Sequence, residues 1–295
     1  MNSRTKCAIC KKQGKKLFEI PYSSKKMSLF LQNYYGKNKK IKKFITQLKD
    51  YHYVLLKCEM CQFIWQQYSL KEKLQKVLYD EIIDYKSSYK KSKKMFKLQK
   101  NSFQNEFNFI KNFFKSEKVN VLDYGAGWGS WILSIKNKRN NTYALEFSKR
   151  RQKILSKEGI RLISLPKLIE KKNKIDFIRV EQVLEHLDNL NEALNIFHNV
   201  SKKNSLLQIA VPNSKALFKN GWNKRLLTKG PAQPLEHLNS FTKKSLNKLL
   251  YKFSFKKISI IDLFRLFLLD FKNFKIFIKI IYNNLNNTSV IVRKF

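Results

Sequence analysis

Acidic residues are scarce in this sequence of 295 residues, with 21 Asp and Glu against 61 Lys and Arg, so the formal net charge is +40. Glycine and proline are also few, at 8 and 5 residues. Two interpretations of the charge stay open. It could attract nucleic acid or anionic lipid. It could instead reflect a genome biased toward A and T, and the even spread of lysine along the chain favours this second interpretation.

Long hydrophobic runs are also absent. No stretch reaches the ~18 apolar residues of a membrane span, because six charged residues interrupt the longest apolar region, 258–282. The polar N-terminus does not have the apolar core of a signal peptide. We therefore expect a cytoplasmic protein without a transmembrane segment. Residues 262–282 alternate apolar and cationic side chains, which predicts either a helical insertion packed on the core or a peripheral contact with a membrane surface.

Cysteine is limited to four residues, which form two C-x-x-C pairs, Cys7 with Cys10 and Cys58 with Cys61. In a cytoplasmic protein this number and spacing indicate a metal rather than disulfides. Two thiolates from each pair would complete a tetrahedral zinc site and leave no position for water, so we predict structural rather than catalytic Zn²⁺. Free buried cysteines and redox chemistry are the alternatives.

A glycine-rich loop follows the apolar run 119–122. Asp123 stands at the end of this run, Gly125, Gly127 and Gly129 follow at every second position, and an amphipathic segment comes next. This order predicts a strand, a tight loop and a helix. A second apolar run ends about 20 residues later in Glu146, where a carboxylate suits a ribose diol. A carboxylate beside the loop would repel a pyrophosphate but tolerate a cationic ligand.

The D-x-G-x-G-x-G pattern resembles the first motif of the class I S-adenosylmethionine-dependent methyltransferases. The resemblance implies an α/β fold with a Rossmann-like sheet of seven strands. It also implies that Asp123 and the three glycines hold the methionine part of S-adenosyl-L-methionine and that Glu146 holds the ribose. A buried parallel strand is predicted at 175–181, and Glu181 at its carboxyl end is a further cofactor-binding candidate. Further strands are predicted at 159–163, 253–261 and 288–294, the last of them antiparallel as the resemblance implies, and a helix is predicted at 70–83.

The string V-L-E-H-L at 183–187 resembles the fourth motif of the ubiquinone-biosynthesis O-methyltransferase-like branch. Some relatives carry E-x-x-E-H and hold magnesium there, whereas the first position here is Gln182, a weaker ligand for a hard dication. Three roles stay open for this segment. Glu185 and His186 bind a metal with His237, or His186 is a general base or substrate contact, or the pair braces the start of a helix.

A second block, at 236–246, resembles E-H-x-x-x-F-[ST]-x-x-S-L of the same branch and makes Glu236 and His237 catalytic candidates beside His186. A histidine that titrates near neutral pH can take a proton from the acceptor as the methyl group moves. The preceding loop, 214–234, carries Trp222 and is interpreted as a lid or substrate loop.

The cysteine module resembles the zinc-ribbon of bacterial sugar and small-molecule methyltransferases, which makes Tyr85 and Tyr89 either pocket residues or packing aromatics. We predict a zinc-ribbon module with an insertion at 1–86, a linker and leading helix at 87–118, and a methyltransferase domain at 119–295. The expected reaction is O- or C-methylation of a small molecule or carbohydrate. An RNA methyltransferase and a catalytically inactive S-adenosylmethionine-binding module are the alternatives, and nucleic acid is the less favoured partner.

Overall fold

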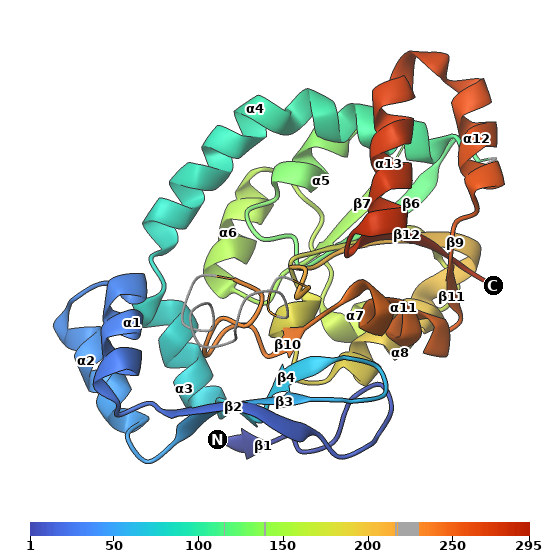
Figure 1. Cartoon of the computed structure of the whole chain (residues 1–295). Helices are drawn as coiled ribbons and strands as arrows, with labels where there is room; N and C mark the ends of the chain where they lie inside the picture. Colours follow the sequence, from blue (N-terminus) through green and yellow to red (C-terminus); the bar gives the residue numbers. More distant parts are fainter. Residues whose placement is uncertain (115, 139, 216, 218–229) are drawn as a thin grey trace. The chain divides into compact units, whose positions relative to one another are not determined.

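The computed structural model describes residues 1–114, 116–138, 140–215, 217 and 230–295, and Figure 1 shows their secondary structure. The chain forms two compact units. The first contains residues 1–86, 184–190 and 212–249, and the second contains residues 87–183, 191–211 and 250–295. Two segments from the C-terminal half of the chain therefore belong to the same unit as the N-terminal cysteine pairs.

The second unit is built on a mixed six-stranded sheet with the order β11-β12-β9-β8-β6-β7. Its four central strands are parallel: β6 (Val119–Tyr124), β7 (Asn140–Leu145), β8 (Ile175–Glu181) and β9 (Ser201–Ala210). At the other end β12 (Ser289–Lys294) runs antiparallel to β9, and β11 (Phe255–Lys257) runs antiparallel to β12. The predicted α/β Rossmann-like fold and the antiparallel last strand are thus confirmed.

Two predicted strands are shorter than expected. The segment 159–163 contributes one parallel bridge, between Leu162 and Ala144 at the edge of β7, so the described sheet has six strands where seven were expected. The segment 253–261 contains only the three residues of β11, because Ser259 caps a helix by accepting a hydrogen bond from the backbone nitrogen of Asp262. Apolar periodicity alone does not distinguish a strand from a short buried helix.

Helices cover the sheet of the second unit, and their apolar faces form its core with buried strand residues such as Val121 and Phe177. The parallel strands β6 and β8 are buried along nearly their whole length, as strands covered on both faces are. The predicted insertion near the C-terminus is a pair of helices, α12 and α13. The helices are α4 (Tyr85–Lys111), α5 (Ser130–Ile135), α6 (Lys149–Lys157), α7 (Leu165–Ile169), α8 (Leu190–Val200), α12 (Ile260–Leu269), the short η3 (Phe271–Asn273) and α13 (Phe274–Asn286).

The first unit contains a four-stranded antiparallel sheet with the order β10-β4-β3-β2. Its strands are β2 (Lys15–Pro21), β3 (His52–Lys57), β4 (Ile64–Gln66) and β10 (Asn239–Ser240). The edge strand β10 comes from a distant part of the chain and pairs with β4, so that Asn239 lies opposite Trp65. A separate pair joins β1 (Asn2–Ser3) to β5 (Tyr68–Ser69).

The insertion between the cysteine pairs forms helices α1 (Lys25–Tyr35) and α2 (Lys39–Gln47), which Ser24 and Asn38 cap through their side-chain oxygens. The predicted helix at 70–83 is α3 (Glu72–Val77) followed by the π-helical turn η1 (Leu78–Ile82). The short η2 (Leu184–His186) also belongs to this unit, and α11 (Lys243–Lys252) crosses the boundary at residue 249. No helix in the described part of the chain combines the length and the apolar character that a membrane span requires.

Candidate functional site

The glycine loop lies between β6 and α5 in the second unit. Gly125, Gly127 and Gly129 all have left-handed backbone angles, with φ of 79°, 60° and 79°. A Cβ atom on Gly125 would lie 2.5 Å from Val183 Cγ2, and one on Gly129 would lie 2.5 Å from Leu155 Cδ2. A Cβ on Gly127 would meet no atom within 4 Å. Two of the glycines are therefore required by packing, while the backbone of Gly127 borders open space that a ligand can enter.

Three carboxylates lie at the carboxyl ends of neighbouring parallel strands, as predicted from the strand pattern. Asp123 is near the end of β6, Glu181 ends β8, and Glu146 follows β7. Glu146 points toward the glycine loop, where its Oε2 accepts a hydrogen bond of 2.8 Å from the backbone nitrogen of Gly127. Its Oε1 accepts one of 2.9 Å from the backbone nitrogen of Ser148. The acid predicted to bind a ribose thus borders the loop.

The electrostatic environment of Asp123 suits a cation. The pKa of Asp123 is raised to about 6: burial raises it most, the charge of Arg179 lowers it, and the charges of Glu181 and Glu146 raise it. The guanidinium of Arg179 lies 3.8 Å from Asp123 Oδ1 and 3.4 Å from Glu181 Oε2. The sequence interpretation overlooked Arg179, although it lies two residues before Glu181 and therefore on the same face of β8. Arg151 Nη1 lies 3.8 Å from Glu146 Oε1, so two arginines face the three carboxylates, and a bound cation would find further attraction there.

Helix α4 contributes aromatic and hydroxyl groups around the same loop. Trp128 Nε1 donates a hydrogen bond of 2.9 Å to Ser88 Oγ, and the rings of Trp128 and Tyr89 lie 4.9 Å apart. The guanidinium of Arg151 lies 5.2 Å from the ring centroid of Trp128. Tyr89, one of the two tyrosines considered for a pocket, therefore contacts the loop, whereas Tyr85 is exposed.

A second group of polar side chains lies in the first unit, around η2. Nδ1 of His186 lies 3.0 Å from the backbone oxygen of Glu236. A carbonyl oxygen only accepts hydrogen bonds, so Nδ1 is the donor and Nε2 of a neutral His186 is left with its lone pair. The rings of His186 and His237 are 4.9 Å apart. The ligand atoms of Glu185, His186 and His237 all lie within 4.8 Å of one another, which brings together the three residues considered for a metal.

The two remaining catalytic candidates differ in their environment. Glu236 Oε1 accepts hydrogen bonds from the hydroxyl of Tyr35, at 2.7 Å, and from Gln233 Nε2, at 2.6 Å. His237 is largely buried, and its burial lowers its pKa. A histidine with a lowered pKa is neutral at neutral pH and can accept a proton.

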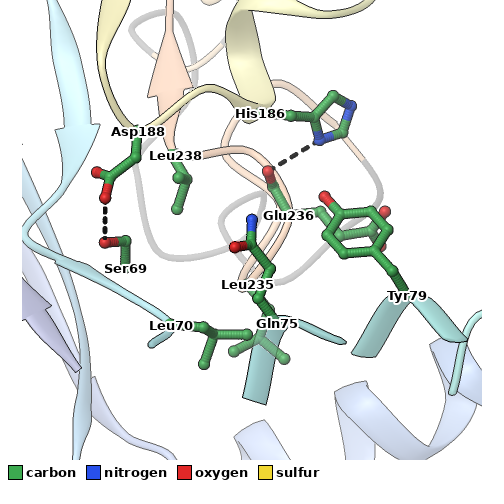
Figure 2. Close-up of a pocket in the computed structure, with 9 residues that line it drawn as sticks. All are labelled: Ser69, Leu70, Gln75, Tyr79, His186, Asp188, Leu235, Glu236 and Leu238. Carbon is green, nitrogen blue, oxygen red and sulfur yellow. Dashed lines mark hydrogen bonds between the residues drawn. The ribbon is translucent and has the colours of Figure 1, made fainter. Parts of the chain in front are cut away.

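A pocket opens beside His186 and Glu236, and Figure 2 shows the nine residues that line it. Ser69 Oγ donates a hydrogen bond of 3.0 Å to Asp188 Oδ2, and Arg4 lies 3.0 Å from the other oxygen of Asp188. No lysine or arginine is among the described residues that line the pocket, although the chain contains 61 such residues. The lining residues are Ser69, Leu70, Gln75, Tyr79, His186, Asp188, Leu235, Glu236 and Leu238.

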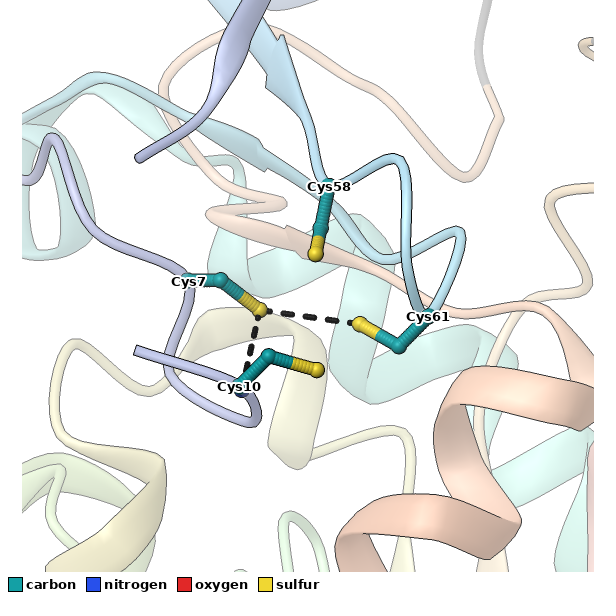
Figure 3. Close-up of side chains that lie close together, drawn as sticks. All are labelled: Cys7, Cys10, Cys58 and Cys61. Atoms are coloured by element: carbon teal, nitrogen blue, oxygen red, sulfur yellow. Dashed lines mark hydrogen bonds between the residues drawn. The ribbon is translucent and has the colours of Figure 1, made fainter. Parts of the chain in front are cut away.

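The four cysteines converge in the first unit, as Figure 3 shows. Their sulfur atoms all lie within 4.8 Å of one another, and the sulfurs of Cys7 and Cys61 are 3.6 Å apart. A tetrahedron with Zn–S bonds of about 2.3 Å has edges of roughly 3.8 Å, so this spacing fits zinc. The residues after the two pairs, Lys11 and Gln62, share a left-handed φ of 61°, so both C-x-x-C turns end in the same backbone conformation. The donor set and its geometry therefore suit a structural zinc ion.

The sequence from residue 65 to residue 260 matches the family model described as "Methyltransferase domain". The chain belongs to this methyltransferase family. It is an S-adenosylmethionine-dependent methyltransferase, and the glycine loop with its carboxylates lies within the matched residues. No protein of curated function shows significant sequence similarity to the methyltransferase.

Among solved structures, the methyltransferase is similar to a 1,6-didemethyltoxoflavin-N1-methyltransferase of Burkholderia thailandensis, with 15% identity, coverage of 70% of this chain and 86% of that one, and a TM-score of 0.44. It is also similar to a SAM-dependent methyltransferase of Archaeoglobus fulgidus, with 18% identity, coverage of 72% and 100%, and a TM-score of 0.43. A SAM-dependent methyltransferase of Aquifex aeolicus has 17% identity, coverage of 58% and 90%, and a TM-score of 0.40. The family assignment rests on the domain match.

Several site residues lie outside the sequence predictions. Arg4, Tyr35, Gln75, Tyr79 and Asp188 surround the pocket or hold its carboxylates, but none belongs to a motif. Proximity to the second cysteine pair was the only signal for Gln75 and Tyr79. Trp222 and most of the predicted lid loop, 218–229, lie outside the described residues.

Proposed function

We propose that this methyltransferase transfers the methyl group of S-adenosyl-L-methionine to an oxygen or carbon atom of a small polar molecule, such as a sugar. The observation that supports this most directly is the lining of the pocket in Figure 2. Six of its nine side chains carry hydroxyl, amide, imidazole or carboxylate groups, the other three are leucines, and its acidic members are Asp188 and Glu236. The described lining offers no lysine or arginine to the phosphates of an acceptor such as RNA, whereas a polyol would find partners for hydrogen bonds.

In this proposal the cofactor is held by the second unit. Asp123, Glu181 and the loop of Gly125, Gly127 and Gly129 would hold its methionine part, and the carboxylate of Glu146 would hold the ribose hydroxyls. When bound, S-adenosylmethionine supplies an already activated sulfonium methyl group, so the protein mainly has to align donor and acceptor.

The acceptor proton is assigned to the histidine pair. His186 Nε2 takes this proton, because the backbone oxygen of Glu236 fixes the opposite nitrogen as the donor. His237 is held neutral by burial and lies next to His186. Glu236, fixed by Tyr35 and Gln233, accepts a hydrogen bond from the acceptor and orients it.

The decisive experiment uses methyl-labelled S-adenosylmethionine, purified protein and fractionated cell extract, with and without nuclease. Label should appear in a small polar fraction and survive nuclease. Label that is lost after nuclease would show a nucleic-acid acceptor and overturn the proposal. Absence of both label transfer and cofactor binding would indicate an inactive module.

The roles of the histidines are tested in the same assay. His186→Asn should lower kcat by about 100-fold or more, the usual contribution of a general base. His198→Asn is the matched control, because His198 Nδ1 also bonds a backbone oxygen, that of Phe253, at 3.1 Å, but lies in the second unit. Its activity should stay within about twofold of the unsubstituted protein. Equal losses in both variants would point to structural damage instead of proton transfer.

We further propose that Cys7, Cys10, Cys58 and Cys61 hold a structural Zn²⁺, and that the chain is similar to the ubiquinone-biosynthesis O-methyltransferase-like branch with an added zinc-ribbon. The convergence of the four sulfurs supports the metal. The motifs at 183–187 and 236–246 support the branch. In this arrangement zinc stabilises the first unit and takes no part in methyl transfer, because four thiolates fill its coordination sphere.

A further inference from the structure

The helical insertion of the second unit has an inner face that is well packed. Along the chain, η3 joins α12 to α13, and the three elements stand between β11 and β12; Figure 1 shows the two helices. The rings of Phe267 and Phe277 stack with centroids 4.8 Å apart, and Leu263, Leu266 and Ile280 are buried in the core. These residues account for the folding of the helix pair. The exposed apolar side chains on the same two helices are not needed for this packing.

The opposite face of the same helices is also apolar, and it is exposed. Residues 260–285 contain ten of the 21 exposed large hydrophobic side chains in the described part of the chain. On α13, three of them recur every fourth residue, at Phe274, Ile278 and Tyr282, so they form one stripe. This concentration exceeds the scatter of single apolar residues on an ordinary surface. We define the outer face by Ile260, Ile261, Phe264, Leu268, Leu269, Phe271, Phe274, Ile278, Tyr282 and Leu285.

The charges beside the outer face are positive. Arg265, Lys272 and Lys275 are exposed on α12, η3 and α13. The two acidic residues of the insertion have partners, since Asp262 lies 3.6 Å from Arg293 Nη1 and Asp270 accepts a hydrogen bond of 2.7 Å from Asn273 Nδ2. An apolar stripe bordered by cationic side chains is the pattern of helices that lie in the surface of an anionic membrane.

Two other binding partners fit the outer face less well than an anionic membrane. A second copy of the chain would bring together two molecules that each carry a formal charge of +40, and this repulsion opposes association. Nucleic acid would use the lysines but would leave the ten apolar side chains in water.

We propose that the outer face docks the protein onto the surface of an anionic lipid bilayer. The apolar side chains enter the acyl boundary, and Arg265, Lys272 and Lys275 meet the lipid phosphates. This docking surface does not depend on the acceptor proposed above.

Vesicle co-sedimentation with the full chain tests the proposal. The protein should bind vesicles of 70% phosphatidylcholine and 30% phosphatidylglycerol, bind pure phosphatidylcholine much more weakly, and dissociate as salt is raised, because salt screens the attraction. The double variant Leu269→Gln with Phe271→Gln should weaken binding by at least tenfold, since it removes two large apolar groups without changing the charge. Leu98→Gln is its control, because Leu98 on α4 is 70% exposed and Leu269 is 71% exposed. It should bind within about twofold of the unsubstituted protein.

The charge contribution is tested separately. Lys272→Gln with Lys275→Gln should weaken binding roughly 25-fold, because each basic residue near an anionic surface contributes about fivefold. The control is Lys39→Gln with Lys40→Gln, two exposed lysines of α2. This variant has the same net charge as the Lys272→Gln, Lys275→Gln variant and should bind vesicles nearly as well as the unsubstituted protein. Failure of the unsubstituted protein to bind anionic vesicles would overturn the proposal. So would equal losses in all the variants, or a dimer in vesicle-free solution that Leu269→Gln with Phe271→Gln dissociates.

Discussion

Gly127 and Gly129 offer a direct test of how the cofactor loop works, because they share a left-handed backbone but differ in their surroundings. Replacement of either by alanine forces a Cβ into the left-handed region, at a cost of about 1–2 kcal/mol. On Gly127 the new methyl group meets no atom within 4 Å. On Gly129 it lies 2.5 Å from Leu155 Cδ2 and 2.9 Å from Ile160 Cδ1, both of which belong to buried residues.

The two variants should therefore separate stability from binding. Gly129→Ala adds an overpacking cost of about 1–3 kcal/mol, so its total loss is about 2–5 kcal/mol of unfolding free energy. Gly127→Ala should lose only the backbone cost. Its methyl group, however, would fill the space through which the cofactor approaches the backbone, so its affinity for S-adenosylmethionine should fall by at least tenfold.

Urea denaturation and titration calorimetry with S-adenosylmethionine measure the two quantities independently. Gly127→Ala should be the more stable variant and a markedly weakened binder. The reasoning is refuted if Gly127→Ala binds the cofactor with unchanged affinity, because the open space at Gly127 would then serve no ligand. Equal destabilisation of the two variants would show that Leu155 and Ile160 move aside freely.

Three further predictions concern charge and metal. The pKa of Asp123 is raised to about 6, so affinity for the cationic cofactor should fall as pH drops through 6. The unliganded fold should gain stability over the same range, because it binds a proton more tightly than the unfolded chain does. A pH-independent Kd in calorimetry would contradict the predicted loss of affinity. Arg179→Met should cost about 3 kcal/mol at pH 8, measured by urea unfolding, and less at pH 5, where Asp123 is protonated; an equal cost at both pH values would argue against the pairing. Cys58→Ser should lose the zinc that the unsubstituted protein retains at about one equivalent, measured by mass spectrometry, and Met60→Ser, an exposed residue of the same turn, should retain it.

The positions of the glycine loop and its carboxylates can be predicted from the sequence, because these residues are close together in the chain and follow strong local rules. Asp123 and the three glycines occupy one turn, and Glu146 follows the neighbouring strand. Strand ends in a parallel sheet lie at one edge, so these positions can be placed without coordinates. Arg179 could have been found by the same alternation on β8.

The pocket half could not be predicted in this way. Tyr35, Gln75 and Asp188 come from three separate segments that the first unit brings together. These residues belong to no sequence motif, and only the tertiary structure brings them next to the pocket. The secondary structure after residue 253 was misjudged for a related reason, since a short apolar run fits a strand and a buried helix equally well.

The pairing of β10 with β4 has a consequence for biosynthesis. The two strands are joined at Asn239 and Trp65, so the edge of β4 has no neighbour on that side until residue 239 has left the ribosome. The two cysteine pairs are complete by residue 61, and metal capture can therefore precede closure of this sheet during translation. A fragment ending at residue 86 would keep all four thiols yet expose an open strand edge, which favours self-association. Nascent chains of this protein should accordingly depend on chaperones until β10 is in place.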